Sequence, residues 1–221
     1  MRLALAAAVA LLAVASGVGA GYFAYDGSVD SDMARIFAAI VTGLTAILCA
    51  PLRRQIAPTG VTGPIGWAIA WGILIAIVAA LLPGRATVEF PVILGMAGAT
   101  LVFALERAHA AIALRLDENG ATTVVLLIAL PVTAAPLWLG PLSVDPVVGS
   151  IAATIALSIS PLGYLAGATE VDVLRSTWLY AHSELGSVRY AYPDPFACAA
   201  LLVGVGIGFW HLTPQRSVKE R

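Results

Sequence analysis

The residues best placed for proton or ion chemistry are Glu106, Arg107 and His109, which stand within four consecutive positions of the chain. On a helix, Glu106 and His109 share one face and lie one turn apart. A carboxylate and an imidazole in this arrangement can relay a proton or bind a solute together. Ionisable side chains are costly inside a membrane, so those found there commonly mark an ion or substrate pathway. The alternative interpretation is a long helix that simply emerges into solvent at this point.

Prolines inside two apolar stretches are the second feature that could serve a chemical purpose. Pro131 and Pro136 flank Thr133, and Pro161 follows Ser160. An interior proline removes a backbone hydrogen bond and frees a carbonyl, and carriers use such broken helices to surround a bound solute. We therefore predict a binding or transport site made of Glu106, Arg107, His109 and Thr133. The alternative is a plain kink, which membrane helices tolerate.

The region from Glu170 to Asp194 gathers acids, bases and aromatic residues. Its members include Asp172, Arg175, Trp178, Tyr180, His182, Glu184, Arg189, Tyr190 and Tyr192. An enzyme that acts on a lipid headgroup would need such acids and bases, together with arginines that bind phosphate. However, Trp and Tyr belts with arginine anchors are typical of any segment at a membrane surface. The region therefore supports a third functional hypothesis, an interfacial enzyme.

Signatures of known chemistries are missing from the sequence. It has no G-x-S-x-G nucleophile elbow, no His-Glu-x-x-His motif and no Walker loop. Cys49 and Cys198 both lie in apolar runs, where we interpret them as small packing residues. A haem held by His109 and His211 would need both at one depth, whereas seven crossings place them at opposite membrane faces. We predict no catalytic residue, no metal site and no cofactor, so enzymatic activity is the least favoured hypothesis.

The elements that must position these residues follow from composition. Of 221 residues, 60% are hydrophobic and 11% are charged, and the mean hydropathy is +0.92. A soluble domain carries about 25% charged residues, so most of this surface must face lipid. The net charge of −1 gives no basis for a nucleic-acid partner. The expected partners are membrane lipids, with partner subunits or further copies of the chain as candidates.

Seven stretches without charge are the candidate crossings. They are Leu3–Tyr25, Ile36–Leu52, Gln55–Gly84, Phe90–Leu105, Asn119–Val144, Pro146–Thr169 and Pro195–Gln215. A helix needs about 20 residues to cross ~30 Å of hydrocarbon, so the two shortest stretches must use flanking residues that snorkel. The first stretch exceeds the usual apolar core of a signal peptide, and we expect a retained helix. The sequence predicts an all-α polytopic bundle of about seven spans in one domain, residues 1–221.

A short amphipathic helix is predicted over residues 171–185. Val171, Leu174, Trp178, Ala181 and Leu185 recur at the spacing of one helix face. Such a helix is expected to lie in the membrane interface between the last two spans.

Basic residues set the expected orientation, because cytoplasmic loops are enriched in them. With a cytoplasmic N-terminus, the cytoplasmic side holds Arg2, Arg53, Arg54, Arg107, Arg115, Arg175 and Arg189. The opposite side holds Arg35, Arg85 and the tail residues Arg216, Lys219 and Arg221. The basic tail fits poorly there. Either it tolerates the outer side, or one segment is re-entrant and the tail lies inside.

Three functions are therefore compatible with the sequence. The first is a small permease or carrier in the plasma (inner) membrane, for a solute or ion that the sequence does not identify. The second is a non-catalytic membrane subunit or scaffold, indicated by the short loops and by glycine-lined helix faces such as Gly95–Gly98 and Gly204–Gly208. The third is the interfacial enzyme. The carrier is favoured by the broken segments and by Glu106 and His109.

Overall fold

The computed structural model describes residues 31–51, 53, 63–80, 89–138, 146–172 and 190–213. These residues form seven α-helices and one 3-10 helix, and no strand occurs among them. The elements are α2 (Ser31–Cys49), α4 (Pro64–Ala80), α5 (Glu89–Ile112), α6 (Glu118–Ala134), the 3-10 helix η1 (Ala135–Trp138), α7 (Pro146–Ile159), α8 (Pro161–Thr169) and α10 (Pro195–Leu212). The predicted all-α fold is confirmed for the described part of the chain.

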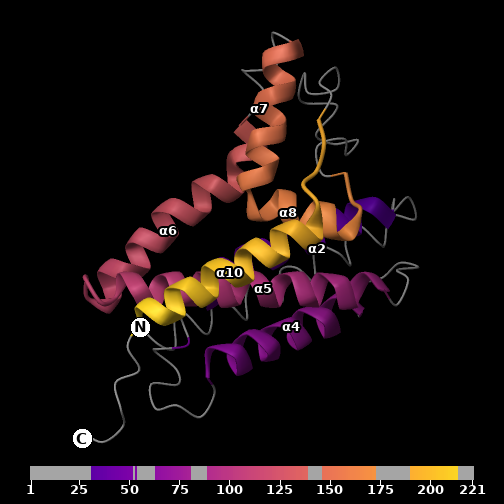
Figure 1. Cartoon of the computed structure of the whole chain (residues 1–221). Helices are drawn as coiled ribbons and strands as arrows, with labels where there is room; N and C mark the ends of the chain where they lie inside the picture. The colour runs from indigo at the N-terminus through magenta and orange to yellow at the C-terminus, as the bar shows by residue number, and fades with distance from the viewer. Residues whose placement is uncertain are drawn as a thin grey trace, which may run out of the picture.

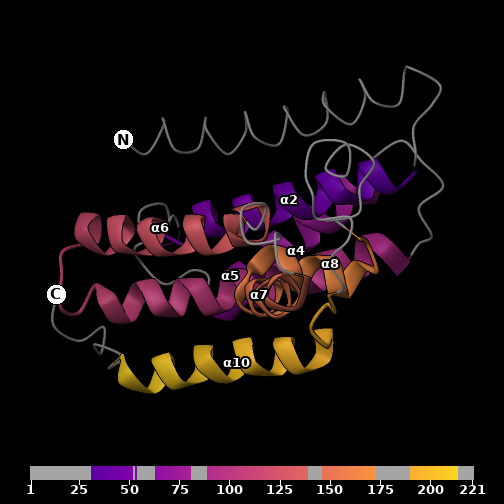
Figure 2. The same cartoon turned by 90° about the horizontal axis from the view of Figure 1, so that it is seen from above.

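Helix α5 is the centre of the bundle. It contacts α2, α4, α6, α8 and α10. In Figure 1, α4, α5 and α10 run roughly alongside one another, and Figure 2 shows α10 on the opposite side of α5 from α6. The side chains of α5 from Leu101 to Ala104 are buried among these neighbours. This position explains how α5 can carry polar residues that lipid would not accept.

Glycines set the closest approach between helices. A Cβ on Gly72 of α4 would lie 2.7 Å from the carbonyl oxygen of Gly95 on α5, and a Cβ on Gly95 would lie 2.6 Å from that of Gly72. A Cβ on Gly206 of α10 would lie 2.4 Å from the nearest ring atom of Phe103 on α5. The predicted small faces therefore do bring helices together. A Cβ on Gly204 or Gly208 would meet nothing within 4 Å, so this part of α10 faces outward.

The sixth predicted segment is broken at Ser160. Helices α7 and α8 meet there at 89°, and α7 stands across the direction of α5 and α10 (Figure 1). Pro161 begins α8, and the Ser160 hydroxyl accepts a hydrogen bond from Leu162 N at 3.1 Å. A Cβ on Gly163 would lie 2.0 Å from the carbonyl oxygen of Leu157, so only glycine permits this bend. In the fifth segment, by contrast, α6 continues through Pro131 before it passes into η1.

Many large apolar side chains of the described helices are exposed, while the charged side chains Glu106 and Arg107 are buried. Phe196 is 84% exposed, Leu201 is 67% exposed and Glu106 is 0% exposed. A soluble protein shows the opposite distribution. α5 and α10 are each long and apolar enough to cross a membrane, and α7 with α8 makes a third if the bent pair is one span. Together these features indicate a membrane protein.

The seven crossings stay a prediction, because α2, α4 and α6 are shorter apolar helices. The first predicted span, Leu3–Tyr25, lies outside the described residues. So does most of the helix predicted over 171–185, of which only Val171 and Asp172 are described, and neither is helical.

Candidate functional site

A buried group of charges joins three elements at one end of the bundle. Glu106 and Arg107 lie on α5, Arg53 follows the end of α2, and Trp210 and Thr213 lie at the end of α10. We call these five residues the Glu106 cluster. Glu106 is 0% exposed and Arg107 is 6% exposed. The helix therefore does not emerge into solvent at this point, and the first strongly exposed position beyond it is Leu114.

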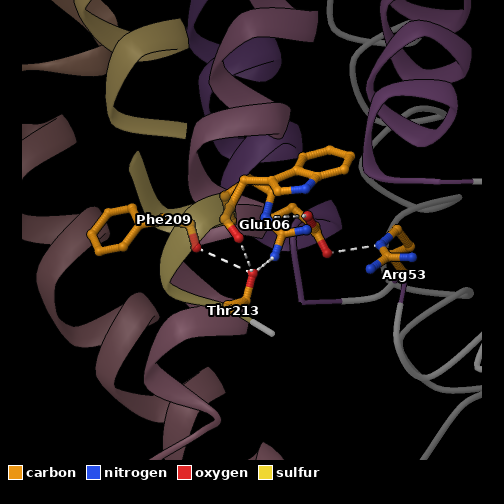
Figure 3. Close-up of polar contacts among 6 residues, drawn as sticks. Arg53, Glu106, Phe209 and Thr213 are labelled. Carbon is orange, nitrogen blue, oxygen red and sulfur yellow. Dashed lines mark hydrogen bonds and ion pairs between the residues drawn. The ribbon is translucent and has the colours of Figure 1, made fainter. Parts of the chain in front are cut away.

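The two oxygens of the Glu106 carboxylate have different surroundings. Oε1 accepts a hydrogen bond from Arg53 Nε at 2.7 Å (Figure 3). Oε2 lies 3.8 Å from Arg107 Nε, which is an ion pair without a hydrogen bond. Among the described residues, no group donates a hydrogen bond to Oε2, although this atom is buried. The Glu106 carboxylate is therefore hydrogen-bonded through Oε1 and faces Arg107 through Oε2.

Arg107 ties the end of α10 to α5. Its Nη2 donates a hydrogen bond to the Thr213 hydroxyl, and its guanidinium carbon lies 5.0 Å from the centre of the Trp210 ring. Thr213 Oγ1 is in turn within hydrogen-bond distance of the carbonyl oxygens of Phe209, at 3.1 Å, and Trp210, at 3.0 Å (Figure 3). An arginine over an indole face gains cation–π attraction in addition to its hydrogen bond. Arg107 therefore holds the last turn of α10 against α5, next to Glu106, which binds Arg53.

His109 does not pair with Glu106 as the spacing suggested. Its side chain is 1% exposed, and Nε2 lies 3.1 Å from the hydroxyl of Thr122 on α6. That hydroxyl also donates to the carbonyl oxygen of Glu118 at 2.8 Å. Glu106 bonds Arg53 and His109 bonds Thr122, and no hydrogen bond joins the two side chains. Although one helical turn separates them, Glu106 faces Arg53 after α2 and His109 faces Thr122 on α6.

Thr133 lies away from the Glu106 cluster. Its hydroxyl donates to the carbonyl oxygen of Ala129 at 2.7 Å, and its own carbonyl accepts from the Ser160 hydroxyl at 3.0 Å. Its methyl group faces Gly43, near the middle of α2. Of the four residues predicted as one site, the structure therefore places Glu106 and Arg107 together, with His109 nearby and Thr133 elsewhere.

Arg53, Trp210 and Thr213 are the cluster members that the sequence did not predict, and Arg53 is the charged one. The signal available was charge, because Glu106 is an acid in an otherwise apolar stretch and needs a cation beside it. The sequence offers twelve basic residues and no means of choosing among them. The choice depends on how α2 and α5 pack, because Arg53 and Glu106 are 53 positions apart.

A second polar group lies at the other end of α10, in the region predicted as an interfacial site. Asp172 Oδ1 accepts hydrogen bonds from Tyr190 at 2.6 Å and from Tyr192 at 2.9 Å. The two rings meet edge to face, with their centres 5.8 Å apart. Glu170 ends α8 with φ of 55°, which turns the chain towards this contact. His182, Glu184 and Arg189, the residues that would serve the enzyme hypothesis, lie outside the described residues.

Within the described ranges, no three side chains of His, Cys, Asp or Glu gather as a metal ion would need. No protein-family model matches the chain, and neither the curated proteins nor the solved structures show one similar to it. The function of the chain must therefore be inferred from the geometry of these residues.

Proposed function

We propose that this chain is a small permease or carrier of the plasma (inner) membrane, and that the Glu106 cluster is its working site. The observation that supports it is a fully buried carboxylate paired with Arg53 in an apolar bundle. The cytoplasmic N-terminus expected from the sequence belongs to the same proposal.

Burial is what makes this carboxylate informative. Removing charges from water costs several kcal/mol per ion, and apolar residues in their place are often as stable or more stable. A buried ion group is therefore weak evidence for a stabilising role. Ionisable side chains inside a membrane protein more often mark the path of an ion or solute. Glu106 and Arg107, at 0% and 6% exposed, fit that description.

The position of the cluster supports a gate. It joins the ends of α2, α5 and α10 through an ion pair and a hydrogen bond made by charged side chains. Alternating access needs helices that part at one membrane face and close again. Salt bridges at such interfaces can break and re-form as helices move. We propose that the Arg53–Glu106 pair closes the passage at this end of the bundle.

Transport by the reconstituted protein tests the proposal. Proteoliposomes would be supplied with inorganic phosphate, acetate, alanine, glucose or potassium, and uptake compared with that of empty liposomes. Once a probe is found, we expect Glu106→Gln to reduce its uptake to the empty-liposome level. Arg53→Gln provides a second variant, because it leaves Glu106 beside Arg107 if Glu106→Gln fails to fold.

Glu118→Gln is the matched control. Glu118 is an exposed acid in the first turn of α6, near the same end of the bundle. We expect this variant to transport like the wild type. Uptake that is unchanged in folded Glu106→Gln and Arg53→Gln would remove the cluster from the mechanism. A wild type that moves none of the probes would count against the carrier itself.

A non-catalytic membrane subunit is the second candidate. It is favoured by α10, where Gly204 and Gly208 stand one turn apart and face outward with nothing within 4 Å. Glycines at this spacing allow a second membrane helix to approach closely. Gentle extraction in detergent followed by mass measurement separates the two candidates. A lone 22.7 kDa species that still transports would exclude the subunit role.

A further inference from the structure

Contacts between helices define the two ends of the bundle. At one end Arg35 of α2 lies 5.4 Å from the ring centre of Phe90 on α5, and Asp172 bonds Tyr192 just before α10. We call this the Asp172 end. At the Glu106 end, Arg53 follows α2 and bonds Glu106. α2, α5 and α10 therefore all run from the Asp172 end to the Glu106 end.

A third set of contacts marks the middle of the bundle. A Cβ on Gly98 of α5 would lie 3.2 Å from Thr42 of α2. A Cβ on the next residue of α2, Gly43, would lie 3.8 Å from Thr133 of α6 and 3.4 Å from Leu165 of α8. Gly98 is about 12 Å from both Phe90 and Glu106 along α5, at 1.5 Å per residue. This level is therefore midway between the two ends.

Helix α6 covers only half of the distance. It starts at the Glu106 end, where Thr122 contacts His109, and reaches the middle at Thr133. Those eleven residues rise about 16 Å. Helix α8 covers the other half, because Ser160 bonds the carbonyl of Thr133 and the chain beyond α8 reaches Asp172. The nine residues of α8, Pro161–Thr169, rise about 14 Å.

The two half-helices add up to one membrane thickness. Their combined rise of about 30 Å matches the ~30 Å of hydrocarbon that a single crossing must cover. α7, which precedes α8 in the chain, lies at 89° to α8; it projects away from the bundle in Figure 1 and is seen end-on in Figure 2. A helix in that direction adds nothing to the crossing. Ser160 joins the halves through its bonds to Thr133 O and Leu162 N.

We propose that α6 and α8 together make one discontinuous crossing, interrupted at mid-membrane by the α7 excursion. With the predicted span Leu3–Tyr25, the chain then crosses six times in place of seven. An even number of crossings puts both ends of the chain on the same side of the membrane, the side of the Glu106 cluster.

The distribution of basic residues agrees with this topology. The Glu106 side receives eight of the twelve, namely Arg2, Arg53, Arg54, Arg107, Arg115, Arg216, Lys219 and Arg221. The Asp172 side receives Arg35, Arg85, Arg175 and Arg189. The excess of basic residues identifies the Glu106 side as cytoplasmic. The basic tail that fitted poorly with seven crossings now lies inside, and the Glu106 cluster faces the cytoplasm. This inference rests on the membrane placement in the proposed function, not on transport.

Single cysteines and a membrane-impermeant maleimide test the topology in intact cells. Cys49→Ala and Cys198→Ala first remove the native thiols. Asn119→Cys, Glu170→Cys and Ser217→Cys then report on the start of α6, the end of α8 and the tail. We expect Glu170→Cys to react from outside, and the other two to react only after the cells are permeabilised.

Seven crossings predict the reverse relation, with Glu170→Cys on the same side as Asn119→Cys and Ser217→Cys opposite to it. That result, or any other pattern that differs from the expected one, overturns the proposal. Each variant must elute from a sizing column in detergent like the wild type before its reactivity is scored. Since labelling measures sidedness alone, the topology can fail while transport by the Glu106 cluster is upheld, and the reverse is also possible.

Discussion

Helices α5 and α10 lie side by side, yet they distribute their polar and apolar residues in opposite ways. Over the 18 most apolar consecutive residues of each helix, 56% of the residues of α5 are buried, compared with 6% of those of α10. The helix with charged residues is inside and the helix without them is outside. In water the hydrophobic effect would reverse this order. In lipid an apolar face gains nothing by burial, so α10 is held by close packing and by Arg107.

The largest effect expected from this comparison comes from removing the buried acid. Glu106→Ala removes the carboxylate that pairs with Arg53 and Arg107, and losing one partner of a buried ion pair costs about 3–5 kcal/mol. Leu201→Ala on the outer face of α10, where the side chain is 67% exposed, is expected to change stability by less than about 0.5 kcal/mol. Thermal unfolding of both variants in the same detergent measures the contrast. Equal losses of stability in the two variants would mean that another helix or subunit covers the outer face of α10.

The crossing of α4 and α5 provides the next largest effect. In Gly72→Ala the new methyl would lie 2.7 Å from a backbone oxygen of α5, which cannot move without separating the helices. We expect a loss of about 2–3 kcal/mol in the free energy of unfolding. Gly63→Ala, just before α4, is the control, because its methyl meets nothing within 4 Å. A Gly72→Ala variant as stable as the control would contradict the close crossing.

The two faces of α10 can be compared within one helix. Gly206→Ala places a methyl 2.4 Å from the Phe103 ring, and overpacking of this kind costs about 1–2 kcal/mol. Gly204→Ala faces open space and should stabilise the helix by up to about 1 kcal/mol. Melting temperatures of the two variants should therefore move in opposite directions. If both fall, the outer face of α10 is in contact with another helix.

The smallest effect concerns the hydrogen bond from α6 to His109 of α5. Thr122→Val removes the hydroxyl 3.1 Å from Nε2, with an expected loss of about 1 kcal/mol. Thr123→Val is matched, since Thr123 is exposed and bonds only the carbonyl of Asn119 in its own helix. Chemical denaturation that gives the same loss for both would show that the bond to His109 does not stabilise the bundle.

The sequence indicates where part of the candidate site lies, but not which residues complete it. Glu106 and Arg107 stood out as ions within an apolar chain, and the structure buries both. Spacing alone allows His109 to pair with Glu106, whereas in the structure its Nε2 lies beside the Thr122 hydroxyl. Arg53 was used only for orientation, because an ion pair across 53 positions leaves no local pattern. Local spacing tells which side chains can meet, and packing selects among them.

The sequence by itself determined that the chain is helical, that its exterior is apolar and that Pro161 breaks a segment, because composition and proline act locally. Tertiary structure alone shows where that break lies among the other helices. Pro161 could equally have kinked one span or separated two. The bond from Ser160 to Thr133 places the break opposite the end of α6. Two half-helices can share one crossing only if they lie at complementary depths in the membrane. Those depths depend on how the helices pack together, so the sequence of a single segment does not show them.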